Sequence, residues 1–162
     1  MNDGVAVPIE PIQVIPLLLA ACPSFESAWA AIEHENVDDE VPAGRLLYLD
    51  AAEFIRHIGQ LQLAESTDEF NAVFDLIERF IVDGDDYVTN LGVIGFLESL
   101  QMATTTSLGL DPEVAFRSWF RPMSEAWWER LNRFWSGEHD ALQVTNEQVA
   151  DEARREPNTD PK

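Results

Sequence analysis

The sequence has little positive charge. Lysine and arginine together number 10 against 30 aspartates and glutamates, which gives a formal net charge of −20 over 162 residues. No basic residue precedes Arg45, and Lys162 is the only lysine. A chain of this charge repels nucleic-acid phosphates and anionic lipid headgroups, and it attracts basic protein surfaces over a Debye length of about 10 Å. We therefore expect a basic protein as partner, and neither a nucleic acid nor a membrane.

Cysteine is also scarce. Cys22 is the single cysteine, so an intramolecular disulfide is excluded, and we expect no cysteine-based zinc site. It ends the apolar stretch Leu17–Cys22, a position that favours a packed thiol over a reactive one.

Long hydrophobic runs are absent. The longest unbroken apolar run falls far short of the roughly 20 residues that a bilayer span requires. The apolar N-terminal stretch is interrupted by prolines, and it carries Asp3 and Glu10 where a signal peptide has positive charge. We therefore expect a cytoplasmic protein.

The apolar residues that are present suffice for one core. Hydrophobic residues make up 46% of the chain and include five Trp and nine Phe, and 162 residues fit a single domain. Apolar residues recur at spacings of three and four, and no stretch has the alternation of a strand. The pattern predicts three helices in the first half of the chain: Ser24 to about Glu33, about Arg45 to Leu63, and the Ser66–Glu69 capping box to Gly84. It predicts three more in the second half: Asp85 or Asp86 to about Met102, Asp111 to before Pro122, and a Ser124 cap to Gly137.

These segments predict an all-α fold, a compact helical bundle of about five to six helices with a HEAT-like central helix pair. The helix after Asp85 is apolar on nearly every side, so we expect it to be central. Gly92 and Gly95 within it would let a neighbouring helix approach closely, and Gly84 is expected in the left-handed conformation that ends many helices. The expected organisation is an extended segment 1–15, a single helical domain 16–137 and a mobile acidic tail 138–162.

The acidic cluster Asp83–Asp86 does not fit a calcium loop. Tyr87 and Val88 stand where such a loop requires an acid or amide and then a glycine. A glycine that ends one helix, followed by an aspartate that caps the next, accounts for the cluster better.

No other motif specifies catalysis or a metal centre. Glu53 and His57 lie one helical turn apart and could form half of a metal site, but no second pair accompanies them. Glu78 and Glu98 lie within apolar helices, and we expect structural or solvated roles for them rather than general acid–base catalysis. The sequence therefore predicts no enzyme activity, no catalytic residue, no cofactor and no metal site.

Two acidic loops are the candidate binding site. The run Glu33–Glu40 holds five carboxylates in eight residues and no lysine or arginine. Such a run is either a solvated face or a landing site for a basic protein, whose association charge complementarity would accelerate. The candidate partner-binding residues are Glu33, Glu35, Asp38, Asp39, Glu40, Asp83, Asp85 and Asp86.

The tryptophan-rich C-terminal third offers an alternative. Trp127, Leu131, Phe134 and Trp135 share a helical face and are expected in the core, whereas Trp128 points off that face and is a candidate exposed anchor. On this interpretation the protein is a helical adaptor or scaffold subunit. A membrane-surface helix is disfavoured by the acidity of the chain, although the same region contains four arginines.

Three stretches together carry a resemblance: PSFESAW at Pro23–Trp29, FDLIERFIVDGDDYVTNLGVIGFLESLQ at Phe74–Gln101, and AWWERLNRFWSG at Ala126–Gly137. They resemble a bacterial family of small, acidic, uncharacterised helical proteins. Its members look like immunity proteins of bacterial toxin systems, which bind and block a cognate toxin domain. The resemblance implies a toxin domain as partner and no catalytic residue. The acidity of the chain suits a basic toxin such as a nuclease, whose groove must attract phosphates.

Overall fold

The structure is a computed structural model, and it describes residues 7–102 and 106–155. Over these ranges the chain is helical, and β pairing is confined to two isolated bridges, which confirms the predicted all-α fold. The α-helices are α1 (Val14–Ala21), α2 (Glu26–Ile32), α3 (Leu47–Leu63), α4 (Phe70–Asp83), α5 (Asp86–Asn90), α6 (Ser99–Gln101), α8 (Pro112–Ala115), α9 (Pro122–Trp135) and α10 (Asn146–Arg155). A π-helical stretch, η4 (Leu91–Glu98), joins α5 to α6, and the 3-10 turns are η1 (Pro11–Gln13), η2 (Pro23–Phe25), η3 (Pro42–Gly44) and η5 (Arg117–Trp119).

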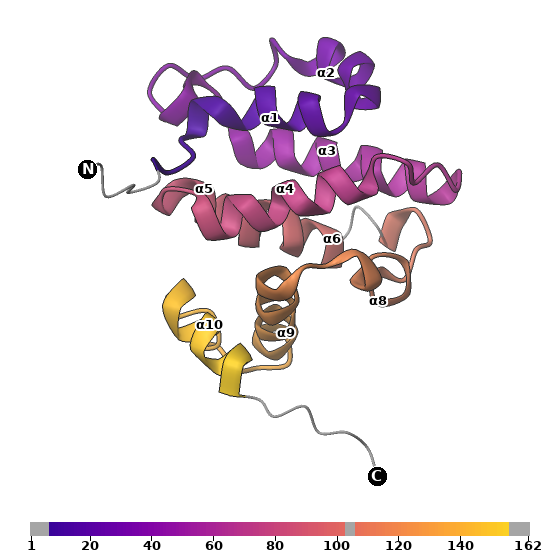
Figure 1. The fold of residues 1–162 in the computed structure, drawn as a ribbon. Helices are drawn as coiled ribbons and strands as arrows, with labels where there is room; N and C mark the ends of the chain where they lie inside the picture. Colours follow the sequence, from indigo (N-terminus) through magenta and orange to yellow (C-terminus); the bar gives the residue numbers. More distant parts are fainter. Residues whose placement is uncertain (1–6, 103–105, 156–162) are drawn as a thin grey trace, which may run out of the picture.

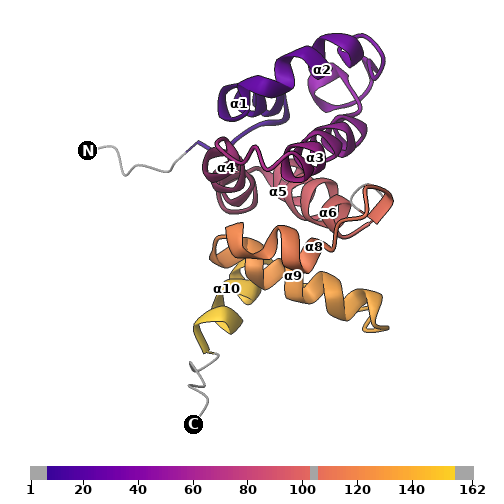
Figure 2. The ribbon, with the colours of Figure 1, turned by 90° about the vertical axis from the view of Figure 1, so that its right-hand side faces the viewer.

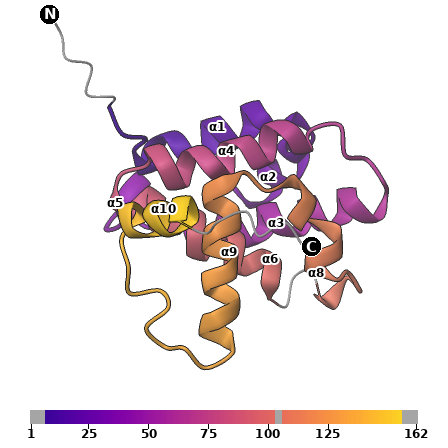
Figure 3. The same cartoon turned by 60° about the horizontal axis from the view of Figure 1, so that its bottom comes forward.

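The helices stack in three layers (Figures 1 and 2). The outer layer contains α1 and α2, the middle layer contains α3, α4 and the continuous α5–η4–α6 stretch, and the third layer contains α8, α9 and α10. Contacts between layers run from α1 to α4 and from α9 to both α4 and η4. Figure 3 shows α9 crossing the middle layer with α10 beside it. The middle layer therefore contributes to both interfaces of the core.

Within the described ranges, no single helix has the length and apolar character needed to cross a membrane. One pair of helical segments, Pro11–Ala21 and Pro23–Ile32, passes on length and composition alone, and it bends by 104° at its break.

The stretch from α5 to α6 lies at the centre of the core, as predicted. Most of η4 is buried, and it packs against α3 and α4. A Cβ added at Gly92 would lie 2.8 Å from Ile81 Cγ1, so the close helix approach predicted for this glycine is confirmed. The apolar stripes of the two neighbouring helices are also buried, at Leu47, Ala51, Phe54, Ile55 and Ile58 of α3 and at Phe70, Val73, Phe74, Ile77, Phe80 and Ile81 of α4.

Both ends of α4 differ from the prediction. Glu69 does not complete a capping box with Ser66; it is itself the N-cap residue, and its carboxylate binds residues far away in the sequence. Gly84 has a φ of −72°, so the predicted left-handed conformation is wrong. Glycine is needed here for space, because a Cβ would lie 2.3 Å from the Phe80 carbonyl oxygen.

The start of α9 is capped by a different residue from the one predicted. Ser124 is not the N-cap, since the helix begins at Pro122 after Arg121. Instead, the Glu78 carboxylate accepts hydrogen bonds from Met123 N at 3.0 Å, Ser124 N at 2.8 Å and Ser124 Oγ at 2.9 Å. A side chain of α4 thus satisfies the free N–H groups of α9, which confirms the structural role expected of Glu78.

The folded unit begins before residue 16. Helix α1 was not predicted, yet its buried side chains pack against α4. Pro16 lies in its first turn, where the N–H that proline lacks has no helical acceptor. Ahead of α1, Ile9 N donates to Asp83 O at 2.8 Å, and Ile9 O accepts from Asp85 N at 2.9 Å. The expected extended segment is therefore part of the domain from at least Ile9 onward, and residues 1–6 lie outside the described residues.

Residues 138–155 do not form the loose tail expected from their composition. Helix α10 packs beside α9 and buries Val149. Arg130 of α9 donates to the Ala141 carbonyl oxygen at 2.7 Å and to the Glu152 carboxylate. The buried side chains of Ala141, Val149 and Arg130 therefore fix a segment whose polar composition suggested disorder. The remainder of the predicted tail, residues 156–162, lies outside the described residues.

Candidate functional site

The acidic run Glu33–Glu40 lies in the connection between α2 and α3, which folds into a narrow loop. Val37 and Arg45 form an antiparallel bridge, and backbone hydrogen bonds on either side of it close the loop. The tip contains two consecutive left-handed residues, Ala43 with a φ of 65° and Gly44 with a φ of 68°. The backbone of the acidic run thus has a defined conformation.

A buried arginine fixes the base of this loop. Arg45 donates from Nε to Asp50 Oδ2 at 2.6 Å and from Nη2 to Asp50 Oδ1 at 3.0 Å. Its Nη1 donates to Glu33 O at 2.6 Å, and its guanidinium lies 4.3 Å from the ring centroid of Trp29. Asn36 Nδ2 donates to Asp50 Oδ1 at 2.9 Å. The side chains of Arg45 and Asp50 are 12% and 1% exposed, so this ion pair is buried.

The loop presents its carboxylates to solvent. Glu35, Asp39 and Glu40 are exposed, and Asp38 is half-buried with its Oδ1 accepting from Glu40 N at 3.0 Å. Among the described residues, none of these four carboxylates forms an ion pair with an arginine or lysine. The fifth, Glu33, contacts a neighbouring exposed histidine. The loop is therefore fixed in shape and strongly negative.

The second acidic segment, Asp83–Asp86, lies at the same end of the molecule (Figure 1). Its backbone pairs with Ile9, and the η1 turn that follows Ile9 packs against η3 at the tip of the first loop. Tyr48 at the start of α3 and Tyr87 at the start of α5 contact each other edge to face, with ring centroids 5.8 Å apart. The fold thus brings together the two acidic segments predicted as candidate sites.

Within the second segment the three carboxylates have different roles. Asp85 caps α5 by accepting from Val88 N at 2.8 Å, which confirms the predicted aspartate cap. Asp83 and Asp86 are exposed, and neither forms an ion pair within the part of the chain that the structure describes. These two carboxylates add to the negative surface, whereas Asp85 stabilises a helix end.

Apolar side chains lie among these acids. Val37 and Leu49 are about half exposed, and Leu46 and Tyr48 are exposed to a smaller extent. We call the surface formed by Glu33–Leu49 and Asp83–Tyr87 the acidic end. It combines exposed carboxylates with exposed apolar side chains.

The tryptophan predicted as an exposed anchor is in the core, so that prediction is wrong. Trp128 is 1% exposed, its Nε1 donates to Glu113 Oε1 at 2.8 Å, and its ring centroid lies 4.9 Å from that of Phe120. The segment before α9 folds back over this face of the helix, which helical spacing alone does not reveal. Trp135, predicted in the core, is instead 50% exposed near the end of α9.

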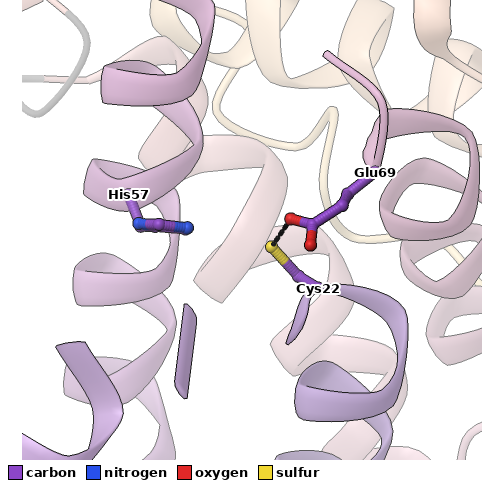
Figure 4. A group of neighbouring side chains, drawn as sticks. All are labelled: Cys22, His57 and Glu69. Carbon is purple, nitrogen blue, oxygen red and sulfur yellow. Dashed lines mark hydrogen bonds between the residues drawn. The ribbon is translucent and has the colours of Figure 1, made fainter. Parts of the chain in front are cut away.

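A polar cluster lies at the opposite end of α4 from Asp83. Cys22 follows α1, Ser24 lies in η2, His57 lies in α3, and Glu69 precedes α4; Figure 4 shows Cys22, His57 and Glu69 converging. Cys22 Sγ and Ser24 Oγ donate to Glu69 Oε2 at 3.0 Å and 2.5 Å, and Ser24 N donates to Glu69 Oε1 at 3.0 Å. Ser24 Oγ also lies 2.8 Å from His57 Nε2. His57 thus joins residues from other helices, and no spacing in the sequence indicates this cluster.

The environment of the cluster sets its protonation. Burial and the hydrogen bond to Glu69 raise the pKa of the Cys22 thiol to about 12. Cys22 is fully buried, which confirms the packing expected of this thiol. Burial lowers the pKa of His57. Burial acts to raise the pKa of Glu69, but hydrogen bonds from Cys22 and Ser24 outweigh it and lower that pKa. Because Glu69 binds Ser24 rather than orienting the imidazole, the cluster lacks the arrangement of a hydrolase triad.

A model of one protein family, described as a domain of unknown function (DUF7674), matches residues 15–136. The chain belongs to this family. The matched region runs from α1 through α9, so it contains both the acidic end and the polar cluster, while α10 lies beyond it. No curated protein and no solved structure matches the chain significantly.

Proposed function

We propose that the protein binds a basic protein through the acidic end, and that this partner is a toxin domain which it occludes. The observation that supports the proposal is the loop Glu33–Glu40, whose exposed carboxylates stand on a base fixed by the buried Arg45–Asp50 pair. The mechanism is steric and electrostatic, and it requires no covalent chemistry and no cofactor.

The fixed conformation of the loop favours binding. A flexible acidic segment loses conformational entropy when it docks, whereas a pre-organised one has lost it on folding. The carboxylates raise the association rate with a positive surface and disfavour acidic competitors. The exposed side chains of Val37 and Leu49 add apolar area that can be buried in a complex, whereas the carboxylates act at longer range.

The third layer of the molecule contrasts with the acidic end. There, several acids are paired with arginines: Arg117 lies 2.8 Å from Glu113 and 2.7 Å from Glu125, and Arg133 lies 2.8 Å from Glu138. The exposed carboxylates of the acidic end have no such partners among the described residues, so their negative charge is available to a positive surface. A toxin that acts on nucleic acid must carry a positive groove, so an inhibitor with such a surface competes with the phosphates of the substrate.

The experiment starts from the tagged protein expressed in its native host. A partner recovered at low salt is purified, and its association rate and affinity are measured against three forms of the protein at low and high salt. The first is the wild type, the second carries lysine at the exposed positions Glu35, Asp39, Glu40 and Asp86, and the third carries lysine at Glu65, Asp68, Asp140 and Glu147. The third form is a control with the same change of net charge, made at exposed acids outside the acidic end.

We expect the second form to lose affinity and association rate, and the control to retain most of both. Equal losses in the two variants would show that only net charge matters, and no loss in either would refute the role of the acidic end. Co-expression tests the toxin part of the proposal: the wild type should restore growth of cells that express the recovered partner. Binding that persists at high salt and is weakened by Trp135→Ala would favour the adaptor function, with Trp135 in place of Trp128 as its exposed anchor.

A further inference from the structure

The polar cluster between the outer and middle layers has the composition of a metal site. One ligand atom each from Cys22, His57 and Glu69 lies within 4.8 Å of the other two. In a tetrahedral zinc site, bonds of about 2.0–2.3 Å place the ligand atoms about 3.3–3.8 Å apart. The distance from Cys22 Sγ to Glu69 Oε2 is 3.0 Å, close to that spacing. We propose that Cys22, His57 and Glu69 bind one Zn²⁺ ion.

The three ligand types favour zinc over other common ions. A sulfur, an imidazole nitrogen and a carboxylate oxygen are all ligands of Zn²⁺, whereas Ca²⁺ and Mg²⁺ select oxygen ligands alone. Cys22 is fully buried, so the protein shields one side of the site. Ser24 is exposed and lies against both His57 and Glu69, so its side of the cluster faces solvent and lets the ion enter. The Ser24 hydroxyl or a water would complete the fourth position.

The charges of the cluster also point to a cation. In the part of the chain that the structure describes, Glu69 forms no ion pair with an arginine or lysine. Its carboxylate is instead satisfied by neutral donors from Cys22 and Ser24. A zinc ion supplies the positive charge that these donors lack, and it replaces the thiol proton with a stronger bond.

The ion would tie together three helices. Cys22 is the C-cap residue of α1, His57 lies within α3, and Glu69 is the N-cap residue of α4. Zinc at this point would link the outer layer to the middle layer at the end of the molecule away from the acidic end. The role is structural, and it is independent of the proposed partner.

Zinc binding should be coupled to the loss of one proton. The thiol is protonated at neutral pH, and zinc binds the thiolate, so Cys22 must release its proton when the ion enters.

The test uses the full-length protein with two ions. Co²⁺ reports thiolate ligation through a sulfur-to-metal charge-transfer band in the near ultraviolet, and Zn²⁺ affinity is measured by competition with a chromophoric chelator. We expect one ion per chain and a cobalt charge-transfer band that Cys22→Ser abolishes. Zinc affinity should fall more than about 100-fold in His57→Gln and Glu69→Gln, because the loss of a partner that only orients a ligand costs roughly 10–100-fold. His139→Gln and Glu65→Gln, at exposed positions, are the matched controls and should change affinity less than twofold.

Three results would overturn the proposal: the absence of a charge-transfer band in the wild type, unchanged zinc affinity in Cys22→Ser, or equal losses in the control variants. Circular dichroism of each metal-free variant checks that it is folded. If Cys22→Ser does not fold, the wild-type cobalt spectrum and the affinity of His57→Gln decide the question. Because no partner protein enters these measurements, the outcome does not depend on the proposed toxin binding.

Discussion

Replacement of Asp50 by asparagine tests how firmly the base of the acidic loop is held. Asp50 accepts hydrogen bonds from Arg45 Nε, Arg45 Nη2 and Asn36 Nδ2, and its side chain is 1% exposed. Asparagine has nearly the same size but no charge, and it places an NH₂ group where one carboxylate oxygen now accepts. The Arg45 guanidinium then remains buried without its counter-charge.

The magnitude follows from the burial of the pair. Removing one partner of a buried ion pair costs about 3–5 kcal/mol, because the other charge remains in a poorly solvated place. Arg45 keeps its hydrogen bond to Glu33 O and its contact with the Trp29 ring, and a cation–π contact contributes about 0.5–2 kcal/mol. We therefore expect Asp50→Asn to lower the free energy of unfolding by about 3 kcal/mol, near the lower end of that range.

Urea denaturation of the single and double variants measures this effect. Arg45→Met removes the buried charge, so the double variant Arg45→Met/Asp50→Asn should be more stable than the sum of the single effects predicts, by about 1–3 kcal/mol. Glu138→Gln is the control, since its pair with Arg133 is exposed and such pairs contribute about 0–1 kcal/mol. The reasoning is refuted if Asp50→Asn costs no more than Glu138→Gln, or if the two single effects simply add.

Two further predictions concern the helix cap and the polar cluster. Glu78→Ala should lower the free energy of unfolding by about 2 kcal/mol in urea denaturation, because Met123 N and Ser124 N lose their acceptor. The control Arg79→Ala, one residue away and exposed, should change it by less than about 0.5 kcal/mol. Equal effects in the two variants would contradict the capping role of Glu78. Burial lowers the pKa of His57 below its ordinary value of 6.5, so the unfolded chain binds a proton first as the pH falls. The stabilisation from this neutral imidazole is complete above pH 6.5 and is lost as the pH falls toward the folded-state pKa. The free energy of unfolding of the metal-free wild type should therefore fall more between pH 7 and pH 5 than that of His57→Asn. A steeper fall in the variant would contradict the predicted direction of the His57 pKa shift.

The sequence predicted well the features that repeat along one helix. The predicted α3 stripe is buried at Leu47, Ala51, Phe54 and Ile58 and half-buried at Leu61, and the α4 stripe is buried at Phe70, Val73, Phe74, Ile77 and Ile81. Spacings of three and four place the residues of each stripe on one side of the helix. The local cap at Asp85 was also predicted, because its donor, Val88 N, lies only three residues away. Both features depend only on residues that lie close together in the sequence.

Caps and contacts made across the fold were not predictable in this way. Ser66–Glu69 has the pattern of a capping box, but the Glu69 carboxylate accepts hydrogen bonds from Cys22 and Ser24, more than forty residues earlier. Ser124 has the pattern of a cap, but Glu78 supplies the acceptor from another layer. In both cases a tertiary partner displaces the local one, and only the packing of helices decides which partner is present.

The acidic end was located from composition, yet its internal support was not. The exposed carboxylates are consecutive in the sequence, whereas Arg45 was assigned only to the start of a helix. Its pairing with Asp50 depends on the α2–α3 loop folding back over the Trp29 ring. The first positive charge in the chain is therefore the residue that holds the acidic loop in place.

The distribution of arginines connects the two proposals. In the described ranges, Arg45, Arg117, Arg121, Arg130, Arg133 and Arg154 all lie in ion pairs within the protein. In the part of the chain that the structure describes, no arginine or lysine pairs with Glu69 or with the exposed carboxylates of the acidic end. The net charge of −20 shows that positive charges are too few to balance the carboxylates of the chain. The repulsion between these like charges opposes the compact state. On the two proposals, cations from outside would relieve this repulsion: a basic protein at the acidic end, and a zinc ion where Cys22, His57 and Glu69 converge.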